Sequence, residues 1–210
     1  MRVIALSDTH LRHEQLAVPP CDLLVHAGDA SRRGSAEELT TFVDWFSAQP
    51  GRHKVFVAGN HDLHCERESE AFRTQAAAAG IVYLQDEEVE IEGVRVFGSP
   101  VTPTFRNMAF NRDPGPPIRA HWDAIPHGLD LLVTHGPPRG ICDRMVLGKH
   151  VGCVDLLETV RRVQPRVHVF GHVHEARGTG RCPGSTTQFL NVANSRFLPI
   201  GQRGPTPFDL

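Results

Sequence analysis

The sequence predicts an α/β fold, because short apolar runs typical of strands alternate with segments of helical pattern along the chain. The six clearest strand-like runs lie at residues 2–6, 22–27, 54–58, 94–98, 129–135 and 166–172. The helical segments lie between them, at residues 35–49, 68–80 and 152–163. A chain of 210 residues suits one domain with a sizeable core, so we expect residues 1–210 to form a single domain.

Signals at the ends of the segments support these assignments. Ser35 begins the first helical segment and Glu38 follows three residues later, which is a capping-box pattern. The second helical segment ends on a glycine, a residue that favours the helix C-terminus. Two further runs, at 88–92 and 188–193, have weaker strand character, and the C-terminal residues 201–210 are expected to extend over the surface.

One long segment, residues 100–126, is rich in proline and fits neither pattern. Long structured loops of this kind are often functional. It could form a wall for a nucleobase, with Phe105 stacking on the base and Asn107 or Asn111 hydrogen-bonding to it. It could equally be a packed structural loop whose aromatic side chains fill the edge of the core. The sequence alone favours neither alternative.

The charge balance excludes one class of partner. Lysine and arginine number 22 against 24 acidic residues, a formal net charge of -2, so no basic surplus is present to hold a long nucleic acid. A small anionic substrate remains open, because a bound metal ion can supply positive charge locally.

The sequence also suggests a compartment. There is no run of about 18 apolar residues that would span a membrane, and the apolar part of the N-terminus is too short for a signal peptide. The five cysteines include no CxxC pair, and their odd number favours reduced thiols. We therefore expect a cytoplasmic protein without a membrane partner, and the oligomeric state stays open.

Side chains that bind metals follow five of the predicted strands, and they stand out in a chain with thirteen histidines. Because ligands of α/β sheets bind outside the carboxyl ends of the strands, we expect these side chains to share one site. Each of them alone could instead be a helix cap or a turn residue. The candidate ligands are Asp8, His10, Asp29, Asn60, His135, His172 and His174.

The donor types indicate which metals the site would take. Carboxylate, amide and imidazole donors without a thiolate suit divalent ions, with Mn²⁺ as our first expectation and Fe, Ni, Co, Zn or Mg as alternatives. Seven donors exceed the needs of one ion, so two ions are expected. Two other histidines, His26 and His168, lie inside predicted strands and are expected in the core or just behind the ligands.

The motifs DTH, GD, GNHD, THGPP and GHVH occur in this order and together resemble the calcineurin-like metallophosphoesterase superfamily. The resemblance extends from Asp8 to His174. The stretches YLQDEEVEIEGVRVFGSPVTPTF and VGCVDLLETVRRVQPRVHVFGHVHE are similar to the metallophosphoesterase domain-containing (MPPED-type) branch. The resemblance implies a two-sheet sandwich flanked by helices, with a dinuclear metal site.

The resemblance also implies roles for the candidate ligands. Asp29 would bridge the two ions, and a hydroxide that also bridges them would attack phosphorus. His61 would act as the general acid for the leaving oxygen, and Asn60 and His61 would contact the substrate. Asp62 could orient His61 or serve the turn. One ion would be held by Asp8, His10, Asp29 and His174, and the other by Asp29, Asn60, His135 and His172.

The leading hypothesis is therefore a metal-dependent phosphodiesterase for small substrates, with 2′,3′- and 3′,5′-cyclic nucleotides as candidates. A phosphomonoesterase, including a protein phosphatase, would use the same ions. A nuclease is disfavoured by the charge balance. A non-catalytic binding protein of the same fold is the alternative of a different class, and the full set of candidate ligands counts against it.

Overall fold

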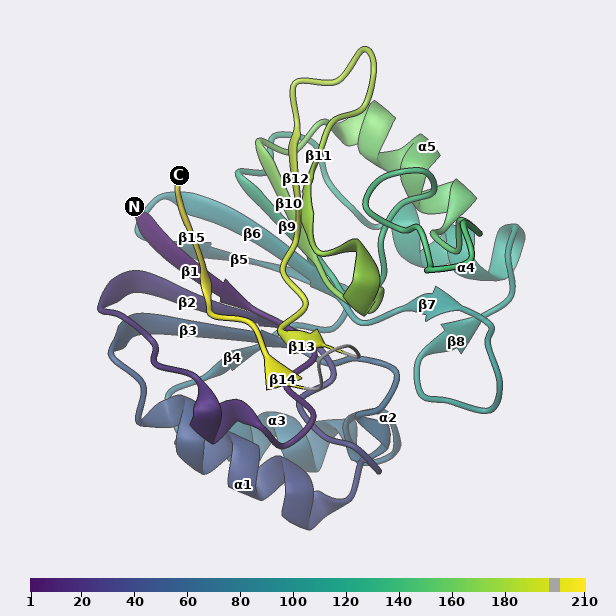
Figure 1. The fold of residues 1–210 in the computed structure, drawn as a ribbon. Coiled ribbons are helices and arrows are strands. Elements are labelled where there is room, and N and C mark those ends of the chain that lie inside the picture. The colour runs from purple at the N-terminus through teal and green to yellow at the C-terminus, as the bar shows by residue number, and fades with distance from the viewer. Residues whose placement is uncertain (197–200) are drawn as a thin grey trace.

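Two β-sheets packed face to face form the centre of the molecule, and helices cover both outer faces (Figure 1). The structure is a computed structural model and describes residues 1–196 and 201–210. The expected two-sheet α/β sandwich flanked by helices is confirmed. Among the described residues, no helix combines the length and the apolar character that crossing a bilayer requires.

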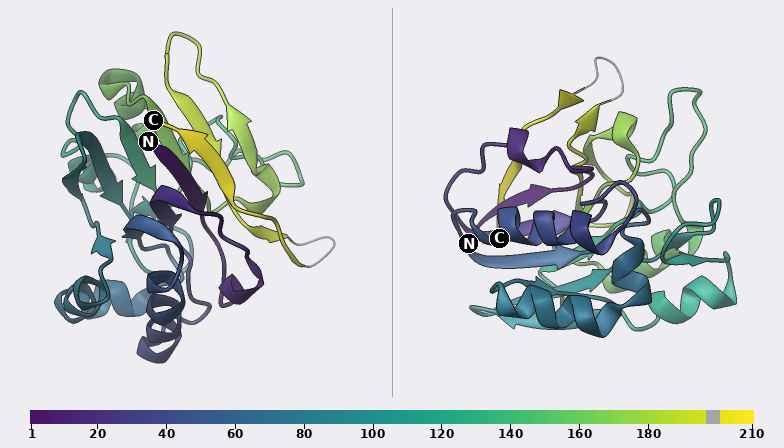
Figure 2. Two further views of the ribbon diagram at one scale, coloured as in Figure 1. Left: turned by 90° about the vertical axis from the view of Figure 1, so that its left-hand side faces the viewer. Right: turned by 90° about the horizontal axis from the view of Figure 1, so that it is seen from below.

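The first sheet has five strands, and all of its pairings are parallel except the one at the C-terminal edge strand. That edge strand pairs antiparallel with the N-terminal strand, so the two chain ends lie side by side (Figure 2). In spatial order the strands are β15 (Thr206–Asp209), β1 (Arg2–Leu6), β2 (Cys21–Ala27), β3 (Gly51–Val57) and β4 (Val82–Tyr83).

The second sheet has six strands, with a parallel centre and an antiparallel strand at each edge. In spatial order they are β11 (Gly178–Gly180), β12 (Gln188–Asn191), β10 (Val167–Phe170), β9 (Leu131–Thr134), β6 (Val94–Ser99) and β5 (Glu87–Ile91). Two small pairings stand apart, β7 (Thr102–Pro103) with β8 (Asn111–Arg112) and β13 (Ser195–Arg196) with β14 (Gly201–Gln202).

The helices divide between the two outer faces, as Figure 1 shows. The first sheet is covered by α1 (Ala36–Ser47), α2 (Leu63–Arg67) and α3 (Ser69–Ala78), and the second by α4 (Pro116–Trp122) and α5 (Val154–Val163). Short 3-10 turns, η1 (His13–Gln15) and η2 (His174–Ala176), complete the helical elements of the described residues.

The N-terminus of α1 extends the expected capping box. Ser35 Oγ accepts a hydrogen bond from the backbone N–H of Glu38, as expected. The Glu38 carboxylate interacts with the backbone N–H of Ser35 and also accepts from the N–H groups of Arg32, Arg33 and Gly34. Helix α1 therefore fixes the loop that follows β2.

Strand β1 shows why the central strands read as continuous apolar runs. Its alternate residues point to opposite faces, so Val3 and Ala5 pack between the sheets while Ile4 and Leu6 pack under the helices. Strands that are buried on both faces need apolar side chains at every position.

The proline-rich segment and the C-terminus are more ordered than the sequence suggested. Residues 100–126 form β7, β8 and α4, and Phe110 and Trp122 are buried, as the packed-loop alternative expects. The C-terminal segment is extended as expected, but β15 is a member of the first sheet and not a surface tail. Its pattern of half-buried and exposed residues, with a proline in the strand, hid this from the sequence.

Candidate active site

The seven candidate ligands meet at one edge of the sandwich, beyond the carboxyl ends of β1, β2, β3, β9 and β10. Hydrogen bonds between the loops tie this edge together, and they include Asp8 N–H to the Gly28 carbonyl at 2.8 Å and His10 N–H to the Asp29 carbonyl at 3.0 Å. The two sheets contribute to the same site because they end side by side.

One group of candidate ligands consists of Asp8, His10 and His174. His174 Nε2 lies 3.1 Å from Asp8 Oδ1 and 3.3 Å from His10 Nε2. The Asp8 carboxylate also accepts the backbone N–H of His172, at 2.9 Å from Oδ2. Three donor atoms from two sheets thus face one point.

The second group consists of Asp29, His135 and His172, with Asn60 beside it. His135 Nε2 lies 2.9 Å from Asn60 Oδ1 and 3.3 Å from Asp29 Oδ1. The other oxygen of Asp29, Oδ2, lies 3.7 Å from His10 Nε2 in the first group. Asp29 therefore presents one oxygen to each group, which is the placement a bridging carboxylate requires.

Three histidines are oriented by backbone carbonyls through their Nδ1 atoms. His10 Nδ1 lies 3.0 Å from the Ser31 carbonyl. His61 Nδ1 lies 2.8 Å from the Arg32 carbonyl, and His135 Nδ1 lies 2.9 Å from the Ala27 carbonyl. A neutral ring that donates from Nδ1 keeps its lone pair on Nε2, which faces the cluster in all three cases. This arrangement fits metal binding, because ligand histidines need a neutral ring with a fixed free nitrogen.

The backbone is held in an uncommon conformation at four of the seven candidate ligands. The φ angles are 56° at Asp8, 44° at His10, 58° at Asp29 and 67° at His172, all in the left-handed region that L-residues seldom adopt. Such strain persists only where the surroundings enforce it, and it clusters at functional sites.

Glycine is required beside the cluster at Gly171. A Cβ atom there would collide with Asp8 Oδ2 and Ser7 Oγ. The glycine of the GHVH motif therefore leaves room for the carboxylate.

The electrostatics keep both buried carboxylates charged. Burial opposes ionisation of Asp8, but the neighbouring His174 lowers the pKa of its carboxyl well below the usual range. Burial likewise opposes ionisation of Asp29, and His135 lowers the pKa of that carboxyl well below its ordinary value. Burial disfavours the cationic form of His135, but the charge of Asp29 outweighs it and raises the pKa of His135 to about 9, so an ion bound at its Nε2 would displace a proton. Burial and the charge on His135 lower the pKa of His172 to about 4, so the His172 ring is neutral. Two anions among imidazoles form a site suited to divalent cations.

Asp62 supports the loops of the site and does not orient His61. Its carboxylate accepts the backbone N–H groups of Gly59 at 2.8 Å, Asp29 at 3.0 Å and Ser31 at 2.9 Å, and also the Ser31 hydroxyl. The ring of His61 is oriented instead by the Arg32 carbonyl. Of the two roles considered for Asp62, the structure shows that of a turn residue, which here joins two loops.

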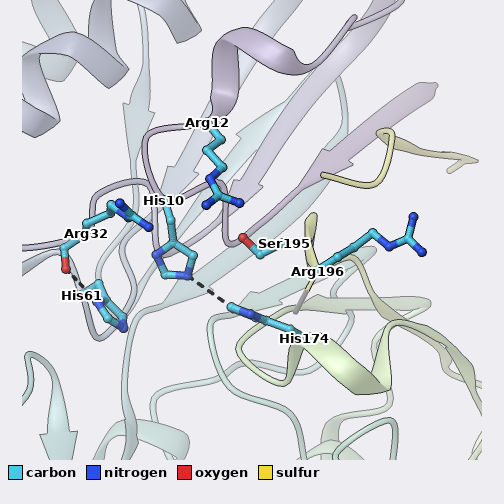
Figure 3. A pocket seen from close by; sticks show the side chains of 7 residues that line it. All are labelled: His10, Arg12, Arg32, His61, His174, Ser195 and Arg196. Atoms are coloured by element: carbon cyan, nitrogen blue, oxygen red, sulfur yellow. Dashed lines mark hydrogen bonds between the residues drawn. The ribbon is translucent and has the colours of Figure 1, made fainter. Parts of the chain in front are cut away.

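His61 stands at the mouth of the site, where the cluster opens into a hollow of about 430 Å³ (Figure 3). Its Nε2 atom is 4.0 Å from Asp29 Oδ2, and 35% of its side chain is exposed. Its ring meets that of His10 edge to face, with centroids 4.8 Å apart. The other residues lining the hollow are His10, Arg12, Arg32, His174, Ser195 and Arg196.

Sequence reasoning did not find Arg12, Arg32, Ser195 or Arg196. The two arginines that follow the DTH and GD motifs could have been noticed from their closeness to candidate ligands. Ser195 and Arg196 belong to a two-residue strand without any pattern, and only the folded chain brings them to the site.

The proline-rich segment reaches the site through its backbone. The N–H of Ala109 donates to the Asn60 carbonyl at 3.0 Å, which helps to position this candidate ligand. Phe105 is 57% exposed and is not among the residues that line the hollow. Asn111 donates to the carbonyls of Phe105 and Arg106 within the segment itself. These contacts favour the packed-loop alternative over a nucleobase wall.

A two-sheet sandwich that gathers Asp, His and Asn at its strand ends, beside a hollow with basic residues, defines a metal-dependent hydrolase of anionic esters. Comparison with known proteins agrees. The family model described as calcineurin-like phosphoesterase matches residues 1–176, and the chain belongs to this family. The family depends on divalent metal ions, and the chain is accordingly a phosphoric ester hydrolase.

The relatives place the similarity along almost the whole chain. The proteins named metallophosphoesterase domain-containing protein 1 from Homo sapiens and Mus musculus are each 38% identical over 224 residues, covering 95% of this chain and 68% of the relative. One solved structure covers 90% of this chain and 89% of its own, with a TM-score of 0.65 at 18% identity. The match to the structure of TT1561 of Thermus thermophilus covers 90% of this chain and 88% of that one, with a TM-score of 0.57 at 12% identity. The two structures support the fold.

Proposed function

We propose that the chain hydrolyses small phosphodiesters with the help of two divalent metal ions, Mn²⁺ being the first candidate and cyclic nucleotides being candidate substrates. The observation that carries the proposal is the double cluster of donors joined by Asp29, with His61 at its open side. The proposal treats residues 1–210 as one domain. It places the protein in the cytoplasm, and the five free cysteines support this compartment.

The two groups of donors would hold one ion each. Bound ions at such a site supply positive charge for the phosphoryl oxygens and activate water for attack on phosphorus. Asp29 would serve both ions, because its two oxygens face the two groups. The remaining ligands would be Asp8, His10 and His174 on one side, and Asn60, His135 and His172 on the other.

His61 is the proposed general acid. Its Nδ1 is committed to the Arg32 carbonyl, so its Nε2 carries a proton only when the ring is cationic. A cationic ring beside Asp29 can donate that Nε2 proton to the leaving oxygen. Asn60 would assist by directing its amide N–H groups, one of which now contacts Met108 Sδ at 3.0 Å, toward a phosphoryl oxygen.

The hollow supports a diester over a monoester. A diester carries a second substituent on phosphorus, which must leave the cluster through open space. The hollow of about 430 Å³ beside His61 gives room for a nucleotide-sized group. A phosphomonoesterase uses the same donors, so the reaction must be assigned by assay.

A plate assay tests the proposal. Metal-stripped protein receives Mn²⁺, Ni²⁺, Co²⁺, Mg²⁺ or Zn²⁺ and is offered bis-p-nitrophenyl phosphate and p-nitrophenyl phosphate in parallel. We expect metal-dependent hydrolysis of the diester well above that of the monoester. A preference for the monoester would identify a phosphatase. Inactivity on both, with ions shown to be bound, would contradict the proposal and favour a binding protein.

A further inference from the structure

The guanidinium groups of Arg12 and Arg32, which line the hollow, have no partner among the described residues. Within residues 1–196 and 201–210, neither Arg12 nor Arg32 makes a side-chain hydrogen bond or an ion pair. Some other arginines of the chain are engaged, as Arg119 is by the buried carboxylate of Asp155 at 2.7 Å. Unpaired cations beside a site for anionic esters point to a ligand that would pair with them.

The two side chains lie on the same side of the cluster. Figure 3 shows the guanidinium groups of Arg12 and Arg32 pointing toward the space around His10 from two different loops. Arg196 also lines the hollow, but in this view its guanidinium extends away from His10. Arg12 and Arg32 are therefore the two arginines whose guanidinium groups both face the space around His10.

The backbone at both arginines is fixed to the loops of the ligands. The Arg12 N–H donates to the Thr9 carbonyl at 2.8 Å, and Thr9 lies between the candidate ligands Asp8 and His10 in the sequence. The Arg32 N–H donates to the Glu38 carboxylate at 3.1 Å, and its carbonyl orients His61. The backbone positions of both arginines are thus fixed by hydrogen bonds within the loops that carry the candidate ligands.

Three of the residues that line the hollow are arginines, although the whole chain has a net charge of -2. No carboxylate is among the described residues that line the hollow. The scissile phosphoryl group would occupy the buried cluster, so the arginines face a different part of the substrate. A guanidinium matches the geometry of a phosphate oxygen pair and is always charged.

We propose that Arg12 and Arg32 form a second anion subsite, which binds a phosphate monoester on the substrate. The preferred substrates would be phosphodiesters that carry this further phosphate, for example a nucleoside esterified at one hydroxyl and phosphorylated at another. This inference rests on the proposed phosphodiesterase function, which it deepens.

A matched pair of substrates tests the subsite. The Mn²⁺-loaded protein is assayed on thymidine 5′-(p-nitrophenyl phosphate) with and without a 3′-phosphate, and kcat/KM is compared. We expect the 3′-phosphate to raise kcat/KM by on the order of ten- to a hundredfold. In the double variant Arg12→Gln, Arg32→Gln this ratio should fall to about one, because both cations are gone.

The neighbouring Arg33→Gln variant is the control. Arg33 lies in the same loop but lines a different hollow, together with Glu14, Glu37 and Glu38. It should keep the preference of the wild type. A ratio near one in the wild type, or a preference that survives the double substitution, would overturn the subsite.

Calorimetry separates the subsite from the proposed function. Thymidine 3′,5′-bisphosphate and thymidine 5′-monophosphate are titrated into wild type and double variant. If neither diester is hydrolysed but the bisphosphate binds more tightly in an arginine-dependent way, the subsite stands and the phosphodiesterase proposal fails. Equal affinity for the two ligands overturns the subsite whatever the activity. Thermal unfolding of each variant confirms that it is folded.

Discussion

The histidine side chains of the site are constrained at one nitrogen so that the other is available. In His10, His61 and His135, Nδ1 donates a hydrogen bond to a backbone carbonyl. The same geometry has different consequences, because His10 and His135 face their neighbours in the buried cluster while His61 stands at its open side. We propose that Nε2 is a metal ligand in the first case and, when the ring is cationic, a proton donor in the second.

Substitution of Asp29 should disturb both ions together. In Asp29→Asn the side chain keeps its shape but loses the charge that faces the two groups. Removing a group behind a metal ligand typically lowers affinity by about 10- to 100-fold, so removing the proposed bridging charge should cost more. Titration of the stripped protein with Mn²⁺, followed by elemental analysis, should show that neither ion is retained.

The matched control for Asp29→Asn is Asp44→Asn, which changes an exposed carboxylate on α1. It should keep the metal content and the activity of the wild type. Retention of both ions in Asp29→Asn would show that Asp29 does not bridge.

Loss of His61 should separate metal binding from turnover. His61→Ala removes the proposed acid but leaves every candidate ligand in place, so both ions should remain. Turnover should fall by about 10²- to 10⁴-fold, and most for esters with poor leaving groups, which need the proton. Metal analysis and kcat on esters of graded leaving-group pKa provide the two measurements. An emptied site would show that His61 is itself a ligand.

At the scale of the elements, the sequence predicted the central strands and the long helices better than the short pieces. Strands β1, β2, β6 and β10 lie within or close to the predicted ranges, because burial on both faces makes most of their residues apolar. Strands of two residues, such as β7, and the short helix α2 carry too few residues to show a period. Their positions depend on contacts between loops.

Asp62 is the clearest example of a side chain that joins loops distant in the sequence. Its carboxylate joins the loop after β3 to the loop after β2 through the N–H groups of Gly59, Asp29 and Ser31. The sequence could place Asp62 beside His61 but could not show these bonds, because the partners in the other loop lie about thirty residues away.

Asp62→Asn should loosen this junction. The amide presents its own N–H groups to backbone donors, so buried N–H groups would lose acceptors at a cost of about 1–3 kcal/mol in the free energy of unfolding. Urea unfolding of the stripped protein measures the cost, and Mn²⁺ titration should show weaker binding because Asp29 is displaced. Asp44→Asn serves again as the control. Unchanged stability and affinity would mean that the junction does not depend on the charge.

At the scale of the whole molecule, the meeting of the ligands was predictable and the hollow was not. Motifs at successive strand ends predict a shared edge, since parallel strands end together. The hollow instead combines residues near both ends of the chain: Ser195 reaches His10 because a bridge between Ser7 and Ala193 joins the sheets there. No local pattern near Ser195 encodes that pairing, so this side of the hollow could be recognised only in the folded chain.

The two-sided burial of the strands also predicts how the protein responds to acid. His168 lies on β10 between the rings of Phe170 and Phe189 and donates through Nε2 to Thr134 Oγ1 at 2.8 Å. Burial lowers the pKa of His168 to about 3, whereas an unfolded histidine titrates near 6.5. The unfolded chain therefore binds the proton first, and the free energy of unfolding should fall as pH falls from about 6.5 toward 3, by at most about 1.4 kcal/mol per unit from this residue.

His168→Gln tests this directly, because glutamine can keep a donor for Thr134 but does not titrate. The free energy of unfolding, measured with urea on the stripped protein from about pH 7.5 to about pH 4.5, should fall less steeply for the variant than for the wild type. Its absolute stability at neutral pH can be lower, since the packing against the two phenylalanines changes, and the slope is the informative quantity. The exposed His127→Gln should keep the slope of the wild type. If the free energy of unfolding changed with pH equally steeply in His168→Gln and wild type, the prediction would be wrong. The folded protein would then accommodate a charged His168 between the second sheet and its helices.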